Sequence, residues 1–423
     1  MRPTANVSRL VLSAAVALAL AALAPVSLAD EPPAAPATPA APPKDAVRIE
    51  MGKPLSAVQD LIKDKKYRDA LAKLKEAEAI TGRTPYENYV IDRLRAQAAA
   101  GAGENEIAAG ALENVVNSGR LPAADQLRMI LAISNAYYQL KFYAKSASWA
   151  QRYQKEGGTE PGAEDMVLNS LYLGNDFAGA AAEVKNIIEA DQKAGRVTPE
   201  QRLQILLTCQ QRIGDQQGQV ATLEKLLENY PSKQYWEIAI SKLEHKSGFA
   251  ERLEIDLLRL RFVLGDLKRE GDFMELAQLA LDVGFPAEAK RVVDEGYKSG
   301  VLGKGNDVDR QKRLQVKVTH DAAEDARTLG LGDMDAEKAK GGDAMVNTGY
   351  NYVLNGKFDH GLSLMEAGLK KGGLKHAEDA KLHLGLAYLQ AGQKARAASI
   401  LRTVSGNDGT ADLAHLWALY ASR

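Results

Sequence analysis

The chain has 423 residues, of which 45% are hydrophobic, 26% are charged and 6% are aromatic. This is the composition of an ordinary soluble globular protein, with few aromatics for a β-sandwich or barrel. The 54 Lys and Arg residues nearly balance the 55 Asp and Glu residues, so the sequence lacks the basic excess that marks nucleic-acid binding. A single cysteine, Cys209, excludes a disulfide framework and a cysteine-based zinc site.

The N-terminal residues have the pattern of a secretory signal peptide. Arg2 and Arg9 are the basic residues, an uncharged apolar run covers 10–23, and small residues precede a cleavage site after Ala29. The alternative, an uncleaved anchor, is disfavoured because about 14 apolar residues are too few to span a bilayer. We therefore predict a signal peptide at 1–29, export to the periplasm, and no integral membrane segment after cleavage.

Residues 30–46 are rich in Pro and Ala. Such a segment cannot form a hydrophobic core and favours an extended polyproline conformation. We interpret it as a linker, and a docking peptide for an aromatic groove is the alternative.

The rest of the chain contains an internal repeat. Leu384-Gly385-Leu386-Ala387-Tyr388 is followed by a turn glycine and a small residue, and a related phrase with Gly349 and Tyr352 lies 36 residues upstream. This pattern resembles the tetratricopeptide repeat, a helix–turn–helix unit of about 34 residues. The resemblance implies an all-α solenoid.

Residues that open the second helix of each unit recur in register. Successive positions are 33 to 39 residues apart, except for one step of 72 that spans a degenerate unit. The sequence therefore predicts an α-solenoid of about nine or ten tetratricopeptide-like repeats, some degenerate. The positions are Tyr67, Asn105, Tyr143, Phe177, Gln216, Phe249, Pro286, Phe358 and Lys394.

Breaks in this rhythm suggest three parts. We predict an N-terminal solenoid at 47–303, a charged, glycine-punctuated degenerate repeat or linker at 304–341, and a C-terminal pair of repeats at 342–423. The last segment, 412–420, has the pattern of a capping helix, which stacked repeats need because the final unit has no neighbour.

Motifs for chemistry are absent from the sequence. There is no H-E-x-x-H, no phosphate-binding G-x-x-x-x-G-K-[ST] and no G-x-S-x-G. The six histidines are scattered, and Cys209 occupies a small-residue core position, which predicts a buried, inert thiol. We therefore expect no enzyme, no cofactor and no metal, with a small-molecule or catalytic site at 304–341 as a minor alternative.

A polar surface on the first helices is the remaining candidate site. In tetratricopeptide arrays the first helices line the concave face, so the resemblance implies that polar residues there bind an extended peptide. The alternative is a solvated face without a partner. The candidate groove residues are Arg128, Asn135, Tyr138, Asn169, Tyr172, Gln211, Arg212, Asn347, Tyr350 and His383.

Two further phrases have a narrower resemblance. Tyr230-Pro231-Ser232-Lys233-Gln234-Tyr235-Trp236 and Gly284-Phe285-Pro286-Ala287-Glu288-Ala289-Lys290 are similar to segments of periplasmic tetratricopeptide proteins that accompany TonB-type energy-transduction systems. This resemblance, over about residues 200–300, implies an adaptor role beside outer-membrane nutrient uptake.

The sequence thus favours a non-enzymatic periplasmic scaffold that binds a protein or peptide, with TonB-system components as the implied partners. An envelope-biogenesis chaperone or cell-wall assembly factor is the alternative. Homo-oligomerisation through an exposed edge of the solenoid is a further alternative, because solenoids often pair by their open faces.

Overall fold

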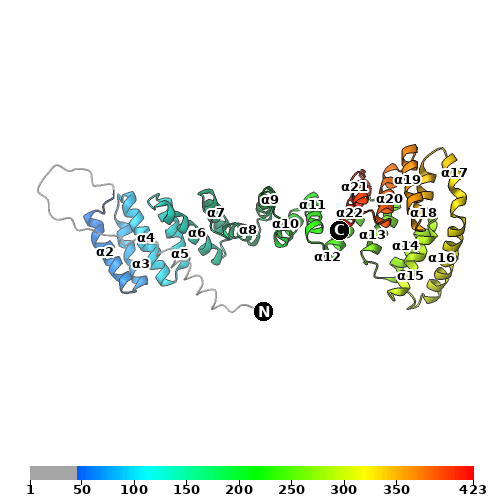
Figure 1. Cartoon of the computed structure of the whole chain (residues 1–423). Coiled ribbons are helices and arrows are strands. Elements are labelled where there is room, and N and C mark those ends of the chain that lie inside the picture. The colour runs from blue at the N-terminus through cyan, green and yellow to red at the C-terminus, as the bar shows by residue number, and fades with distance from the viewer. Residues whose placement is uncertain (1–44) are drawn as a thin grey trace. The chain divides into compact units, whose positions relative to one another are not determined.

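The computed structural model describes residues 45–423, which contain helices and no β-strand. The predicted signal peptide and all but the last two residues of the predicted linker lie outside the described residues. The described chain divides into two compact units at Gln219/Val220, here called unit 1 and unit 2. Consecutive helices pack against each other along each unit (Figure 1), so the predicted all-α repeat array is confirmed.

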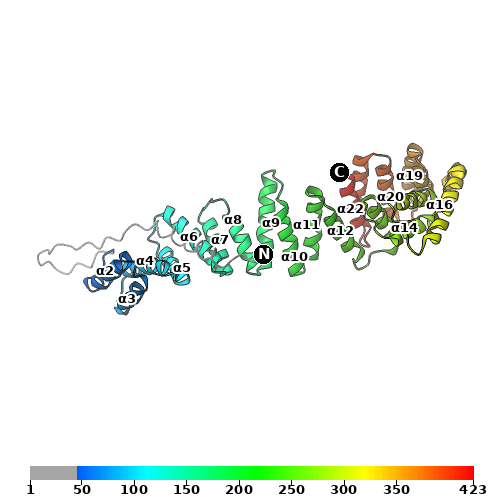
Figure 2. The same ribbon diagram turned by 90° about the horizontal axis from the view of Figure 1, so that it is seen from below.

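Unit 1 consists of helix pairs in chain order (Figures 1 and 2). First helices of neighbouring pairs also contact each other, α2 with α4 and α6 with α8. The helices are α2 (Ile49–Lys63), α3 (Tyr67–Ala79), α4 (Pro85–Ala102), α5 (Asn105–Asn117), α6 (Ala123–Gln139), α7 (Tyr143–Lys155), α8 (Ala163–Leu173), α9 (Phe177–Lys193) and α10 (Glu200–Ile213), and α11 (Gln216–Asn229) crosses the boundary between the units.

Unit 2 continues the pattern and ends in the predicted capping helix. The predicted degenerate segment 304–341 is mostly helical and packs against α15 on one side and α18 on the other. The elements are α12 (Lys233–Glu244), η1 (Glu251–Leu253), α13 (Glu254–Val263), α14 (Glu270–Asp282), α15 (Pro286–Lys298), α16 (Val308–Thr328), η2 (Leu329–Gly332), α17 (Asp333–Lys338), α18 (Asp343–Leu354), α19 (Phe358–Lys371), α20 (Ala377–Gln390), α21 (Lys394–Leu401) and α22 (Thr410–Ala421).

The hairpin turns follow one rule. Eight of the nine predicted second-helix positions are the first residue of a helix. In each of these eight hairpins, the residue two places earlier has a positive φ, from 60° at Lys65 to 82° at Gly284. A left-handed residue at this place reverses the chain after the first helix. Glycine is favoured there because it adopts this conformation without strain.

The core has the predicted composition. In seven of the eight hairpins the residue three places after the start of the second helix is small and buried, and in α11 it is Gln219, which is also buried. The apolar residues that follow are buried too, which confirms the 3.6-residue periodicity. These residues include Ala70, Leu74, Ala77, Ala108, Leu112, Val115, Ser146, Ala180, Val184, Ile187, Leu223, Leu226, Ala289 and Ala397. Cys209 is also fully buried, and this burial raises the pKa of its thiol to about 11.

Phe249 differs from the prediction because it does not open a helix. It lies in the turn between α12 and η1, where Gly248 has a φ of 81°. The next residue, Ala250, is extended and its backbone N–H donates to the carbonyl of Asp408 at 2.9 Å. This distant hydrogen bond takes the chain out of the helical path, and the Phe249 ring packs at Gly409.

Unit 2 therefore closes on itself. Helix α13, near its beginning, contacts α22 at its end, and the side chains of Lys246 and Asp412 form an ion pair at 2.6 Å. The unit boundary at Gln219/Val220 also differs from the predicted break at 303/304, since residues 304–341 lie within unit 2.

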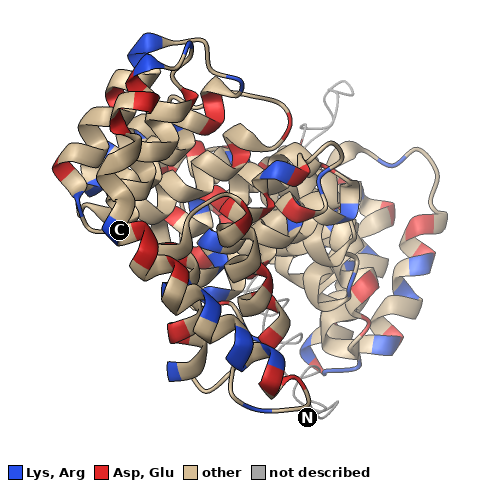
Figure 3. Cartoon of the chain, turned by 90° about the vertical axis from the view of Figure 1, so that its right-hand side faces the viewer, with Lys and Arg blue, Asp and Glu red and all other residues tan. Residues whose placement is uncertain are grey.

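Charged residues of both signs are interspersed along the helices of both units (Figure 3). Within residues 45–423, no helix is long and apolar enough to cross a membrane.

Candidate functional site

The predicted groove residues of unit 1 lie on three first helices. Arg128, Asn135 and Tyr138 are on α6, Asn169 and Tyr172 are on α8, and Gln211 and Arg212 are on α10. Four of these seven side chains are exposed, namely Arg128, Asn169, Gln211 and Arg212. The other three are half-buried. The two cations and two amides that face solvent are therefore the most accessible of these polar groups, although Arg128 lies 3.6 Å from Asp125 in an exposed ion pair.

The half-buried groove residues have structural contacts. The Asn135 side-chain amide donates to the backbone carbonyl of Leu131 at 3.1 Å. The Tyr138 ring packs edge-to-face on Tyr143, with ring centroids 5.6 Å apart. These contacts position the side chains on the helix and leave part of each exposed.

The same aromatic pair recurs one repeat later, where Tyr172 packs edge-to-face on Phe177 with centroids 5.8 Å apart. The guanidinium carbon of Arg212 lies 5.7 Å from the centroid of the Phe177 ring, within the range of a cation–π contact. The Phe177 ring on α9 thus contacts both Tyr172 on α8 and Arg212 on α10.

The three predicted residues of unit 2 have different surroundings. Asn347 on α18 is exposed. Tyr350 is only 1% exposed, and its ring packs against Phe285 and stacks on His383. Tyr350 and His383 therefore belong to the interior of a closed unit and not to an open groove.

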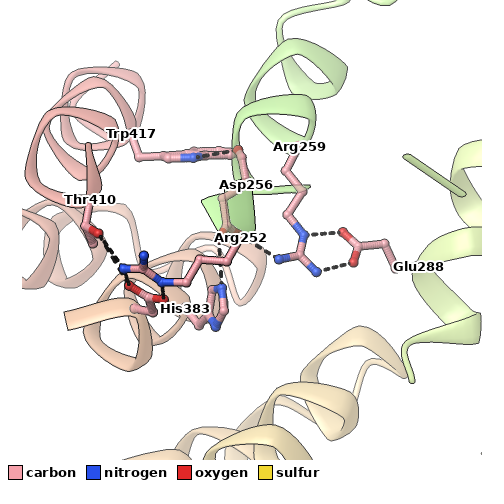
Figure 4. A network of polar contacts seen from close by, with 8 residues as sticks. Arg252, Asp256, Arg259, Glu288, His383, Thr410 and Trp417 are labelled. Atoms are coloured by element: carbon pink, nitrogen blue, oxygen red, sulfur yellow. Dashed lines mark hydrogen bonds and ion pairs between the residues drawn. The ribbon is translucent and has the colours of Figure 1, made fainter. Parts of the chain in front are cut away.

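A buried ion network occupies this interior (Figure 4). The guanidinium of Arg259 donates two hydrogen bonds to Glu288, at 2.9 and 2.5 Å, and one to Asp256 at 2.7 Å. The side chains of Arg259, Asp256 and Glu288 are 5%, 2% and 1% exposed. Because each charge is compensated by a close partner, the network connects α13 to α15 without an isolated buried charge.

The same network connects α13 to the end of the unit. His383 Nε2 lies 3.0 Å from Asp256 Oδ2, and the Trp417 indole N–H donates to the Asp256 carbonyl at 3.3 Å. Figure 4 shows these two side chains converging on Asp256 from α20 and α22. Asp256 is therefore the residue through which α13, α20 and α22 are joined.

A second cluster reinforces this closure near the surface. Arg252 in η1 donates two hydrogen bonds to Asp379, at 2.7 and 3.1 Å, and one to Asp408 at 2.6 Å. Its terminal nitrogen also lies 3.3 Å from the hydroxyl of Thr410 (Figure 4). These hydrogen bonds raise the pKa of Arg252 and lower that of Asp408.

The pKa of Asp256 predicts acid sensitivity of unit 2. Burial alone would raise this pKa, but the charges and hydrogen bonds of His383 and Arg259 outweigh burial and lower it to about 2. A carboxyl with a lowered pKa in the folded state stabilises the fold above its unfolded pKa of about 3.9, and this stabilisation is lost as the pH falls through about 2.

We expect the free energy of unfolding of unit 2 to lose about 2 kcal/mol between pH 5 and pH 2 through Asp256. Urea titrations at several pH values, compared between the chain and its Asp256→Asn variant, measure this contribution. The variant should show the weaker pH dependence because its amide does not titrate. Parallel pH profiles for the two proteins would contradict the role given to Asp256.

The sequence did not identify the network of Arg252, Asp256, Arg259 and Glu288. One signal was present in the sequence. Asp256 and Arg259 interrupt an otherwise apolar segment in which Ile255, Leu257, Leu258 and Leu260 are all buried, and a helix that is apolar on every side is a buried helix. Charges within such a helix must have partners.

Within the described residues, no group of three or more His, Cys, Asp or Glu side chains is placed to hold a metal ion. The chain thus combines a repeat array that has an exposed polar surface on α6, α8 and α10 with a closed unit that has a buried ion network.

No family model matches the chain, and no curated protein matches it in sequence. Among solved structures, a chain of Naa15/Naa10 bound to HypK-THB aligns with 14% identity and a TM-score of 0.31, covering 84% of this chain. This chain spans 63% of that one. Yeast Tom70 aligns with 14% identity and a TM-score of 0.22, covering 88% of this chain and 95% of Tom70.

Proposed function

We propose that the chain is a non-enzymatic periplasmic scaffold that holds a protein or peptide partner against the first-helix surface of unit 1. One observation supports the proposal most directly. Arg128, Asn169, Gln211 and Arg212 are exposed on α6, α8 and α10, the first helices of three successive pairs. The exposed groups are donors and acceptors, which suit the backbone and carboxylates of an extended peptide.

The proposal includes a finer step from the sequence. The phrases at 230–236 and 284–290 resemble periplasmic proteins that accompany TonB-type systems, so the first partner to test is a component of such a system. The signal-peptide pattern at 1–29 supports the periplasmic location, which fractionation of cells expressing the full chain would establish.

Replacing Arg128, Asn169, Gln211 and Arg212 with Ala should abolish or strongly weaken capture of the partner. The full chain, tagged at its C-terminus, is crosslinked in intact cells and the recovered proteins are identified. Because all four side chains are exposed, the fold should keep its stability, which thermal unfolding checks. Truncating central contact residues typically costs about 1–4 kcal/mol of binding each.

A matched control is available on the second helices. Four exposed residues of matching type lie there, namely Gln151 and Lys155 on α7 and Asn186 and Lys193 on α9. Replacing them with Ala also removes two cations and two amides, but from a different surface. Loss of the partner in both variants, or in neither, would refute the choice of surface. Recovery of many unfolded clients in place of one partner would favour the chaperone alternative.

A further inference from the structure

Unit 2 contains a cleft that shares no residue with the first-helix surface of unit 1. It has a volume of about 340 Å³ and lies between α13, α15, α18, α20 and α22. This volume is near the lower end of the range of roughly 300–1,000 Å³ that small-molecule pockets have. The cleft therefore fits a small molecule better than an extended peptide.

Apolar and aromatic side chains make up much of the lining of the cleft. Phe262, Leu386, Leu389, Trp417 and Tyr420 are among the lining residues. Apolar and aromatic side chains with a few convergent polar groups are typical of ligand pockets.

The charged groups of the cleft are mostly cationic. Arg259, Arg291, Lys394 and Arg423 line it against one carboxylate, Glu288. Glu288 is occupied by its two hydrogen bonds from Arg259, and Arg291 lies 3.8 Å from it. Arg259 is also paired with Asp256, and Lys394 donates a hydrogen bond to the backbone oxygen of Arg423 at 3.2 Å. The four cations of the lining still outnumber its one Asp or Glu side chain, Glu288.

Arg423 lacks an acidic partner. Its guanidinium lies over the Trp236 ring, 4.7 Å from the centroid. Across residues 45–423, no Asp or Glu side chain pairs with it. The residue as a whole is exposed, and the contact with the indole lowers the pKa of Arg423 by removing part of its guanidinium from water.

The lining of the cleft also contains a buried hydroxyl, that of Tyr350. Tyr350 is 1% exposed and lines the cleft, and its hydroxyl has no hydrogen-bond partner among the described residues. Three charged residues of the lining influence the pKa of Tyr350: Arg259 and Arg291 lower it, and Glu288 raises it. Buried polar groups in folded proteins almost always have a partner, so this hydroxyl points to a ligand that supplies one. Burial raises the pKa of Tyr350, so the hydroxyl keeps a proton to donate.

We propose that this cleft binds a small organic carboxylate with an apolar body. The carboxylate accepts hydrogen bonds from the Tyr350 hydroxyl and from the guanidinium groups of Arg291 and Arg423. The apolar body packs against the apolar lining residues, which include Leu386 and Trp417. This site stands apart from the scaffold function, because none of its residues lies in unit 1.

The test is a titration of the full chain with four probes, followed by tryptophan fluorescence and calorimetry. Octanoate should bind with a dissociation constant below about 1 mM. Acetate, which lacks the apolar body, and octylamine, which has the opposite charge, should not bind at this concentration. Octanol should bind at least about tenfold more weakly than octanoate, because it cannot use the two arginines. Failure of octanoate to saturate, or equal binding of octanol, would overturn the proposal.

Three variants assign the contacts. Arg291→Gln and Arg423→Gln should each weaken octanoate binding about tenfold, and Tyr350→Phe about fivefold. Tyr350→Phe should leave the thermal midpoint unchanged or raised, because the hydroxyl it removes has no partner in the fold. The control is Lys298→Gln on α15, the helix of Arg291, where the side chain is 78% exposed. If Lys298→Gln weakens binding as much as Arg291→Gln does, the effect is one of general charge and the assigned site is wrong.

Discussion

Replacing Arg259 with Met will lower the free energy of unfolding of unit 2 by about 3–5 kcal/mol. Asp256 and Glu288 share this arginine as counter-charge, and both carboxylates are almost completely buried. Without the guanidinium, two desolvated negative charges remain close together. The expected loss is the free energy of leaving two buried charges unpaired. It is larger than the stability that the intact ion pair adds relative to apolar side chains of similar size.

The measurement uses the full chain with Trp149→Phe, so that the fluorescence comes from Trp236 and Trp417, both in unit 2. Urea unfolding then reports on unit 2 alone. Lys290→Met is the control, because its ion pair with Asp294 is solvent-exposed and should contribute at most about 1 kcal/mol. Equal losses in the two variants would contradict the importance of the buried network.

Replacing Gly349 with Ala will destabilise unit 2 by about 3 kcal/mol. A Cβ at this position in α18 would lie 2.6 Å from the carbonyl oxygen of Gly361 and 2.9 Å from the backbone nitrogen of Met365, both in α19. These obstacles are backbone atoms, so the two helices must move apart. The expected loss is therefore at the upper end of the range for overpacked sites.

For Gly271 in α14 we expect the opposite effect of a Gly→Ala substitution on stability. It also lies within a helix of unit 2, and a Cβ there would meet no atom within 4 Å. Gly271→Ala should stabilise the unit by about 0.5–1 kcal/mol, because alanine loses less conformational freedom in a helix. The same urea titrations measure both variants. A loss of stability in both would mean that backbone packing between α18 and α19 is not the cause.

The repeat array was predictable because its signals are local. The residue that opens a second helix, the left-handed residue two places before it and the small residue three places after it lie within one hairpin. Tyr67 and Ala70 in α3 show this, because a single turn and a single helix face decide both. The exposure of Arg128, Asn169 and Gln211 also follows from the helical register.

The closure of unit 2 was not predictable in the same way. Arg252 and Asp379 are separated by 127 residues, and Trp417 and Asp256 by 161. Contacts at such separations have no period in the sequence and result from the accumulated curvature of all the helices between them. For this reason the sequence predicts that Phe249 begins a helix and that Tyr350 lines an open groove. In the structure Phe249 packs at Gly409, and the Tyr350 ring packs on Phe285 and His383.

The closure of unit 2 also has a consequence for how the chain can evolve. In unit 1 the described helices contact sequence neighbours, so duplication or deletion of one hairpin leaves every remaining interface intact. In unit 2, η1 and α13 near the beginning meet α22 at the end through Arg252, Asp256 and Trp417. Insertion of one hairpin there would displace α22 from α13 and separate these groups. Length variation among descendants of this chain should therefore be confined to unit 1, while the number of hairpins in unit 2 stays fixed.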